Sequence, residues 1–233
     1  MTHRGQTVMI WWALVTMLIF GLSMWQLLGM VPPPGANLPA DEVAAFYRAG
    51  AFRIKLGAMI CSWVSAFAVP FAVVITAQMM RLEKGIPFWS IMQLAGGMLM
   101  SIFLVLPPLF WGVAAFNADR APEITALMHQ LAMLTLVTTD QFYIFQSIAI
   151  AVICFTRKPD PLSPFSRPLG YFTVWAAIMF ELGALAFMFR TGPFSWSGLF
   201  VFWFPFCIFG AWIGVMASAL LGAIMRQRAA SLV

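Results

Sequence analysis

Two carboxylates, Asp140 and Glu181, are the only charged residues that lie deep within the apolar stretches of this sequence. Each is nine residues from the predicted outer end of its stretch. At a rise of about 1.5 Å per residue, both lie about 14 Å below the outer surface, near the middle of a bilayer. Ionisable residues at that depth mark ion pathways, proton relays or ligand sites, so these two acids are the first candidates for chemistry.

The two acids belong to consecutive stretches joined by a short loop, and such helices are usually neighbours. No lysine or arginine lies at the same level in any stretch to neutralise them. Because like charges and a low dielectric both oppose double ionisation, at least one carboxyl group is expected to keep its proton. The pair is predicted to act either as a site for a cation, a proton or a polar ligand, or as a structural hydrogen bond that joins two helices.

Polar residues accompany the first acid. Tyr143 and Ser147 follow Asp140 at i+3 and i+7, on one face of a helix, while Gln141 lies beside it on another face. The predicted binding site therefore consists of Asp140, Glu181, Tyr143, Ser147 and Gln141.

The elements that must position these residues are membrane helices. Of the 233 residues, 62% are hydrophobic and 9% are charged, whereas a soluble domain carries about 25% charged residues. The apolar run that follows the first six residues is too long for the apolar core of a signal peptide. Six stretches are long enough to cross a bilayer, which needs about 20 residues, and they lie near 8–30, 55–80, 87–116, 131–155, 169–190 and 197–225. The sequence thus predicts an all-α membrane protein, a six-transmembrane-helix bundle that forms one integral membrane domain over residues 1–233.

The distribution of positive charge predicts the orientation of the bundle. With the N-terminus inside, the predicted inner segments hold eight lysine and arginine residues and the outer segments hold five. Cytoplasmic loops carry the excess of positive charge, so an inside position is expected for both the N-terminus and the C-terminus (N-in, C-in). We expect a multi-pass protein of the plasma (inner) membrane.

One predicted outer loop has helical character. Residues 40–54 carry apolar side chains at helical spacing, among them Val43 and Tyr47. An interfacial helix that leads into the second span fits this pattern. It is expected to rest on the membrane surface or, alternatively, to form a lid over an outward opening.

Prolines suggest an internal repeat. Pro107 and Pro108 lie inside the third span, and Pro205 lies inside the sixth. Because each half of the chain holds three spans, the halves would be inverted with respect to one another, as in several transporter folds. A 3+3 inverted repeat is therefore a hypothesis for this bundle.

Small residues recur in the sixth span. Gly210, Gly214, Ser218 and Gly222 occupy every fourth position, so they form one ridge along a helix. Such a ridge lets another helix approach closely. The partner helix is expected to belong either to this chain or to another subunit.

The remaining residues argue against most catalytic chemistries. His3 and His129 fall on opposite sides of the predicted membrane, and neither an HExxH motif nor a Walker loop is present. The cysteines, Cys61, Cys154 and Cys207, lie in apolar runs without a CxxC pair. The 17 methionines are scattered as apolar filler rather than clustered for copper or haem. We expect no enzyme activity, no metal and no cofactor, and the positive charge at helix ends does not indicate a nucleic-acid partner.

Two functions are therefore predicted. The first is a channel or carrier for a small solute or ion, with the acidic and polar residues forming a midplane site. The second is a non-catalytic subunit of a larger membrane complex that docks through the small-residue ridge. A homo-oligomer would favour the first function, and an unrelated partner chain would favour the second. In both cases the lipid bilayer surrounds the protein.

Overall fold

The computed structural model describes residues 2–139 and 141–231, and within these ranges every regular element is a helix. Six helical segments are each long and apolar enough to cross a membrane, as predicted. They run over His3–Leu28, Ala51–Met80, Phe88–Phe116, Pro122–Thr156, Arg167–Phe187 and Leu199–Ala230. This is the architecture of a multi-pass membrane protein.

Each span is built from more than one helical element, although the sequence predicts continuous stretches. The first three spans are α1 (His3–Leu22) with η1 (Ser23–Leu28), α3 (Ala51–Val64) with η2 (Ser65–Phe67) and α4 (Ala68–Met80), and α5 (Phe88–Leu99) with α6 (Ile102–Phe116). The last three are α7 (Pro122–Thr138) with α8 (Gln141–Thr156), α9 (Arg167–Phe180) with η3 (Glu181–Phe187), and η4 (Leu199–Trp203) with α10 (Phe204–Ala230). The elements η1 and η4 are π-helical, whereas η2 and η3 are 3-10 helices.

A proline explains the break in the second span. Pro70 lacks the N–H group that would bond to the carbonyl group of Ala66, and its ring would clash with that carbonyl in a regular helix. Ala66 accordingly has non-helical backbone angles (φ −81°, ψ 20°), and the chain passes through η2 before α4 begins. The kink that Pro70 causes in the second span therefore lies one turn before the proline itself, at Ala66.

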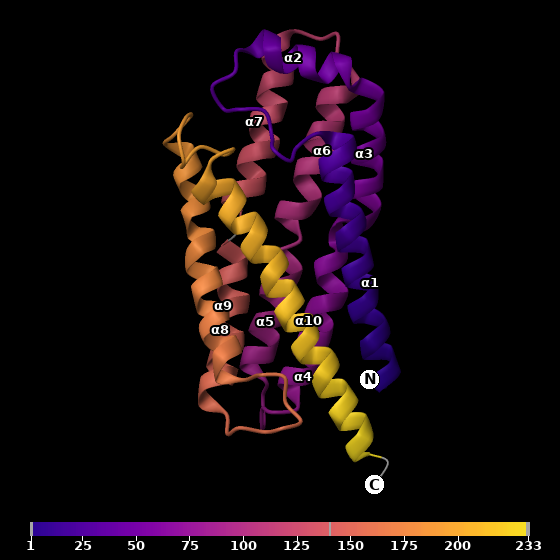
Figure 1. The fold of residues 1–233 in the computed structure, drawn as a ribbon, viewed down its shortest axis with the longest axis vertical. Helices are drawn as coiled ribbons and strands as arrows, with labels where there is room; N and C mark the ends of the chain where they lie inside the picture. The colour runs from indigo at the N-terminus through magenta and orange to yellow at the C-terminus, as the bar shows by residue number, and fades with distance from the viewer. Residues whose placement is uncertain (1, 140, 232–233) are drawn as a thin grey trace.

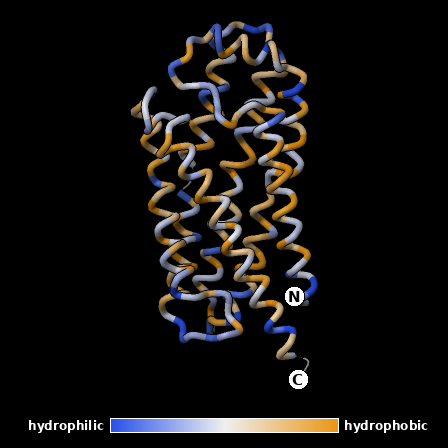
Figure 2. The backbone as a smooth tube through the Cα atoms, in the orientation of Figure 1, coloured by the Kyte–Doolittle hydropathy of each residue, from blue (hydrophilic) through white to orange (hydrophobic). Residues whose placement is uncertain are grey.

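Both termini lie at one end of the bundle, and the short helix α2 (Ala40–Ala49) crosses the other end (Figure 1). These are named the terminal end and the α2 end below. Figure 2 shows that the most hydrophilic residues gather mainly at the two ends, while the length between them is mostly hydrophobic. Many large apolar side chains on the spans face outward, including Trp63, Leu18 and Ile178. An outward apolar surface of this kind suits lipid as the surrounding solvent.

The predicted amphipathic helix is present as α2, and Gly50 separates it from α3. Its apolar residues Val43, Ala44 and Tyr47 are buried, and α2 packs against α7. The apolar face of α2 thus packs on the end of the bundle instead of facing lipid.

Close helix contacts in the interior depend on glycines of the third span. A Cβ atom added at Gly96 would lie 2.8 Å from both the amide nitrogen of Gln146 and the carbonyl oxygen of Phe142, on α8. At Gly97 it would lie 2.7 Å from the Cβ atom of Ala72, on α4. Because these two glycines have no side chain, α5 can lie close to the backbone of α8 and to the side chain of Ala72 on α4.

Three buried glutamines join the spans at the terminal end. The amide nitrogen of Gln78 (α4) donates to Oε1 of Gln6 (α1) at 2.7 Å and to Oε1 of Gln227 (α10) at 3.2 Å. Gln227 in turn donates to Oε1 of Gln78 at 2.8 Å and to the carbonyl oxygen of Leu162 at 2.7 Å. These bonds link α1, α4, α10 and the loop between α8 and α9, which are far apart from one another in the sequence.

Candidate functional site

Tyr143 and Ser147 face the interior of the bundle from α8. They are 1% and 2% exposed, and they share a face because they are four residues apart on a helix. The ring of Tyr143 packs against Phe180 and Trp212, with centroids 4.7 Å and 5.4 Å apart. Among the described residues, neither hydroxyl group has a hydrogen-bond partner.

The other predicted site residues lie elsewhere. Gln141 is exposed, and its amide nitrogen donates to the carbonyl oxygen of Thr138 at 2.6 Å. Glu181 is the first residue of η3 and is also exposed. Asp140 falls between α7 and α8, outside the described residues, so its contact with Glu181 stays a prediction. The side chains of Gln141 and Glu181 therefore do not share the buried surroundings of Tyr143.

Further polar side chains lie buried in the middle of the bundle. Thr76 of α4 donates to Oε1 of Gln93 of α5. Nε2 of Gln93 and Oε1 of Gln146 are buried without a partner among the residues described. A cavity of about 10 Å³, lined in part by Gln146 and Trp212, lies in this region, and its volume is about that of one water molecule.

A second and much larger cavity lies between the first and last spans. Its volume is about 420 Å³. The described residues that line it are all apolar residues or glycines: Met17, Leu18, Phe20, Gly21, Leu22, Met24, Trp25, Val31, Phe67, Phe103, Leu104, Leu136, Val137, Phe180, Val201, Phe202, Pro205, Phe206, Phe209 and Gly210. We call this space the lateral cavity. Its size lies within the range of small-molecule sites, about 300–1,000 Å³.

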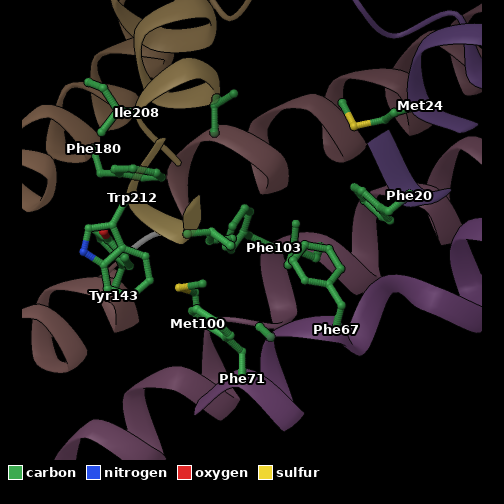
Figure 3. Packing of buried hydrophobic residues seen from close by; sticks show 14 of the residues in the cluster. Phe20, Met24, Phe67, Phe71, Met100, Phe103, Tyr143, Phe180, Ile208 and Trp212 are labelled. Atoms are coloured by element: carbon green, nitrogen blue, oxygen red, sulfur yellow. The ribbon is translucent and has the colours of Figure 1, made fainter. Parts of the chain in front are cut away.

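Aromatic rings form much of the wall of the lateral cavity. Phe209 of α10 contacts Phe67, Phe103 and Phe180, with ring centroids 6.4, 5.7 and 6.1 Å apart. Phe20 of α1 packs edge-on against Phe67 at 5.8 Å. Figure 3 shows Phe103 between Phe67 on one side and the Tyr143–Trp212 pair on the other. The rings thus separate the lateral cavity from the polar interior around Tyr143.

The tilt of the last span accounts for the opening. Residues Leu199–Ala230 form a span of 32 residues, about 48 Å long, whereas the hydrocarbon core of a bilayer is about 30 Å thick. A helix of this length crosses the bilayer at a tilt. In Figure 1, α10 accordingly crosses the bundle obliquely and diverges from α1 toward the α2 end. The residues of both spans that line the cavity lie in this diverging part.

Both π-helical segments border the lateral cavity. Met24 and Trp25 come from η1, while Val201 and Phe202 come from η4. A π-helical turn is rare and is frequently found at functional sites, because it displaces side chains from their ordinary positions. The π-helical segments η1 and η4 therefore both contribute lining residues to the lateral cavity.

The chemistry available in the lateral cavity is that of apolar contact. Of the residues that the structure describes, no charged side chain lines it, and the only hydrogen-bonding one is the indole of Trp25. Over residues 2–139 and 141–231, no group of three histidine, cysteine, aspartate or glutamate side chains is gathered as a metal-ligand set. The cavity is thus suited to a hydrocarbon chain or a flat apolar molecule.

The small-residue ridge of α10 faces outward. A Cβ atom added at Gly210 or Gly214 would meet no other atom within 4 Å, and Ser218 is exposed. The corresponding Cβ atom at Gly222 would lie 3.3 Å from Nη1 of Arg226, on the same helix. Gly210, Gly214 and Ser218 therefore pack against no other helix in the described part of this chain, and docking against another subunit stays a prediction.

His129 has a place that the sequence analysis did not predict. It is 1% exposed instead of lying at the outer surface, and its Nδ1 atom is 2.9 Å from the hydroxyl group of Tyr47. Burial raises the pKa of Tyr47 above its ordinary value, so its hydroxyl group stays protonated. One feature of the sequence could have indicated this burial. The apolar face of residues 40–54 has to be covered by a neighbouring segment.

The lateral cavity was also missed, because its lining residues are ordinary apolar residues of predicted spans. Only the arrangement of the helices distinguishes them from lipid-facing positions. Comparison of the chain with protein-family models, with curated proteins and with solved structures gives no match.

Proposed function

We propose that this chain is a membrane carrier that takes up a lipid-like molecule from the side, between α1 and α10. The lateral cavity carries this proposal: it has about 420 Å³ of space between two membrane-spanning helices, and its lining is apolar over the residues that the structure describes. Protein interiors are close-packed and contain few voids larger than a water molecule. A space of this size and polarity in a bilayer is suited to a hydrocarbon tail.

The surroundings of the cavity support a binding site rather than a packing defect. Most of its lining residues come from the first and last spans, which are the least buried of the six. Both walls include a π-helical segment, and broken or irregular membrane helices are common where transporters bind their substrates. The ligand class that fits is a molecule with a long acyl or isoprenoid chain.

The two acids predicted at mid-depth give the carrier a means of coupling to an ion. Glu181 directly follows Phe180, whose ring lines the lateral cavity. Asp140 and Glu181 are the two acids that the sequence places near mid-depth. In this proposal, protonation of an acid near the cavity accompanies movement of the ligand. The channel or carrier for a small solute or ion that the sequence predicts differs from this proposal in its substrate and in its site.

Two glycines on α10 give a matched test of ligand binding. Gly210 and Gly214 are both exposed and would both accommodate a Cβ atom, but Gly210 alone of the two lines the lateral cavity. The full-length protein in nanodiscs is labelled with a photoactivatable palmitic acid, and labelled peptides are identified by mass spectrometry. We expect labels on residues 17–25 and 201–210, strongly reduced in Gly210→Phe and unchanged in Gly214→Phe.

Equal labelling of the three proteins, or labels spread evenly over all six spans, would contradict a specific site. Carrier activity is measured separately, as protein-dependent transfer of a fluorescent fatty acid across proteoliposome membranes. Loss of labelling in Gly210→Phe without any transfer in the wild-type protein would leave a binding protein and refute the carrier.

A second candidate is supported by the ridge. Gly210, Gly214 and Ser218 face outward with no neighbour from this chain among the described residues, and small-residue ridges favour close helix contacts. The chain is then a non-catalytic subunit or a homo-oligomer. Native mass spectrometry after gentle detergent extraction tests this, because Gly214→Leu should release a partner that the wild-type protein retains.

The orientation N-in, C-in in a plasma (inner) membrane belongs to the same proposal. The charge distribution along the sequence supports it. The test uses a cysteine introduced at Lys158 in a protein whose three native cysteines are replaced. Labelling of intact cells with an impermeant maleimide should fail at this position, and labelling from outside would reverse the orientation.

A further inference from the structure

We propose that the terminal end of the bundle contains a second site, which binds a phosphate-bearing anion. It is a cleft of about 370 Å³ formed by the start of α1, the end of α4, the loop after α8 and the end of α10. Five of its seven lining residues are polar or charged: His3, Gln6, Arg81, Gln227 and Ser231. None of the described residues that line it is acidic.

The groups that face the cleft are hydrogen-bond donors. Arg81 is exposed and brings a guanidinium group, whose planar donors match the oxygen atoms of a phosphate. His3 lines the cleft, and its Nδ1 atom is buried without a partner in the part of the chain that is described. Gln6 is 5% exposed, and its Oε1 atom already accepts from Gln78, which leaves its amide nitrogen as a donor.

The walls of the cleft are held in place before any ligand arrives. The bonds among Gln6, Gln78 and Gln227 fix α1, α4 and α10 relative to one another. Gln227 also donates to the carbonyl oxygen of Leu162, which lines the cleft from the loop after α8. A rigid arrangement of this kind lowers the entropic cost of binding.

The local electrostatics favour an anion. The start of α1 brings a partial positive charge to the cleft, whereas the C-terminal ends of α4 and α10 bring partial negative charges, so the preference for an anion comes from the guanidinium group of Arg81. The two acids of the neighbouring loops are not among the lining residues and already accept hydrogen bonds from backbone nitrogens. Glu83 accepts from the backbone nitrogens of Trp89 and Ser90, and Asp160 accepts from that of Leu162.

This site is separate from the lateral cavity and does not depend on the carrier proposal. Gln6 and Met17, which line the two spaces, are 11 residues apart on α1, or about 16 Å along the helix axis. The phosphate belongs either to the headgroup of an anionic lipid or to a soluble phosphorylated molecule, and the same donors would bind both.

The test compares Arg81→Gln with Arg167→Gln. Both arginines are exposed, and Arg167 does not line the cleft, so the two variants lose the same charge. Native mass spectrometry of the full-length protein, after reconstitution with phosphatidic acid or with phosphatidylcholine, measures retained lipid. Thermal unfolding with inorganic phosphate, against chloride at equal ionic strength, measures soluble anion binding.

We expect selective retention of phosphatidic acid, a saturable phosphate-dependent rise in Tm, or both, according to the source of the phosphate. Arg81→Gln should weaken the response about tenfold, since it removes charge-assisted hydrogen bonds, and Arg167→Gln should not. A His3→Gln variant should weaken it less. The proposal is overturned if neither ligand exceeds its control, or if Arg81→Gln and Arg167→Gln reduce binding equally.

Discussion

The hydroxyl group of Tyr47 and Nδ1 of His129 lie 2.9 Å apart, although 82 positions separate them in the sequence. Their rings also pack edge to face, with centroids 5.8 Å apart, and Trp196 packs against the other side of the imidazole at 5.9 Å. The indole nitrogen of Trp196 donates to the carbonyl oxygen of Pro34 at 2.9 Å. These contacts join α2, α7, the loop after η3 and the loop between η1 and α2 into one cap at the α2 end.

Replacing Tyr47 with phenylalanine should destabilise the cap. The change keeps the ring but leaves Nδ1 of His129 buried without its partner, which costs about 1–3 kcal/mol. Thermal unfolding in detergent should show a lower Tm for Tyr47→Phe. The control is Tyr171→Phe, because Tyr171 is 68% exposed. Equal Tm values for the two variants would mean that the hydrogen bond adds no stability.

Replacing Gln227 with leucine should loosen the terminal end. Gln78 and the carbonyl oxygen of Leu162 would lose hydrogen-bond partners in a buried region, at a cost of about 1–3 kcal/mol. Faster hydrogen exchange at the ends of α1 and α10 would reveal the loosening. Gln141→Leu serves as the control, since the Gln141 side chain is exposed and donates to the nearby carbonyl oxygen of Thr138. Similar exchange in both variants would contradict a locking role.

Substituting alanine at Gly96 and at Gly214 should have opposite effects. At Gly96 the new methyl group meets the backbone of α8 at 2.8 Å, so α5 and α8 must separate, with a loss of about 1–3 kcal/mol. At Gly214 it meets nothing within 4 Å, and the higher helix propensity of alanine adds up to about 1 kcal/mol. Tm values of the two purified variants measure the difference, and a Gly96→Ala protein as stable as the wild type would refute the close approach.

Neutralising the two predicted acids distinguishes coupling from a structural role. Asp140→Asn and Glu181→Gln keep the size of a protonated carboxyl group, so folding should be nearly intact. If the acids couple ion movement to transport, both variants should abolish proton flux in proteoliposomes loaded with pyranine. If the pair is structural, Tm should fall while flux is unchanged. Unaltered flux and unaltered Tm in both variants would remove the acids from the mechanism.

The sequence by itself determined that the chain has six helices able to cross a membrane. An apolar run of about 20 residues can satisfy its backbone in lipid only as a helix, so length and composition suffice for this conclusion. The amphipathic pattern around Val43 and Tyr47 likewise predicted α2, because helical periodicity is a local property. The buried positions of Tyr143 and Ser147 agree with their spacing on one helix face.

Tertiary structure alone decided where those helices meet and where they do not. The lateral cavity depends on the angle between α1 and α10. The sequence does not show whether an apolar residue such as Phe209 faces lipid, a neighbouring helix or a cavity, because the same residue types occur in all three places. The π-helical turns depend on packing, and so do the burial of His129 and the joining of Gln6 with Gln227. In lipid the hydrophobic effect does not drive helices together, so hydropathy specifies the spans but carries little information about their contacts.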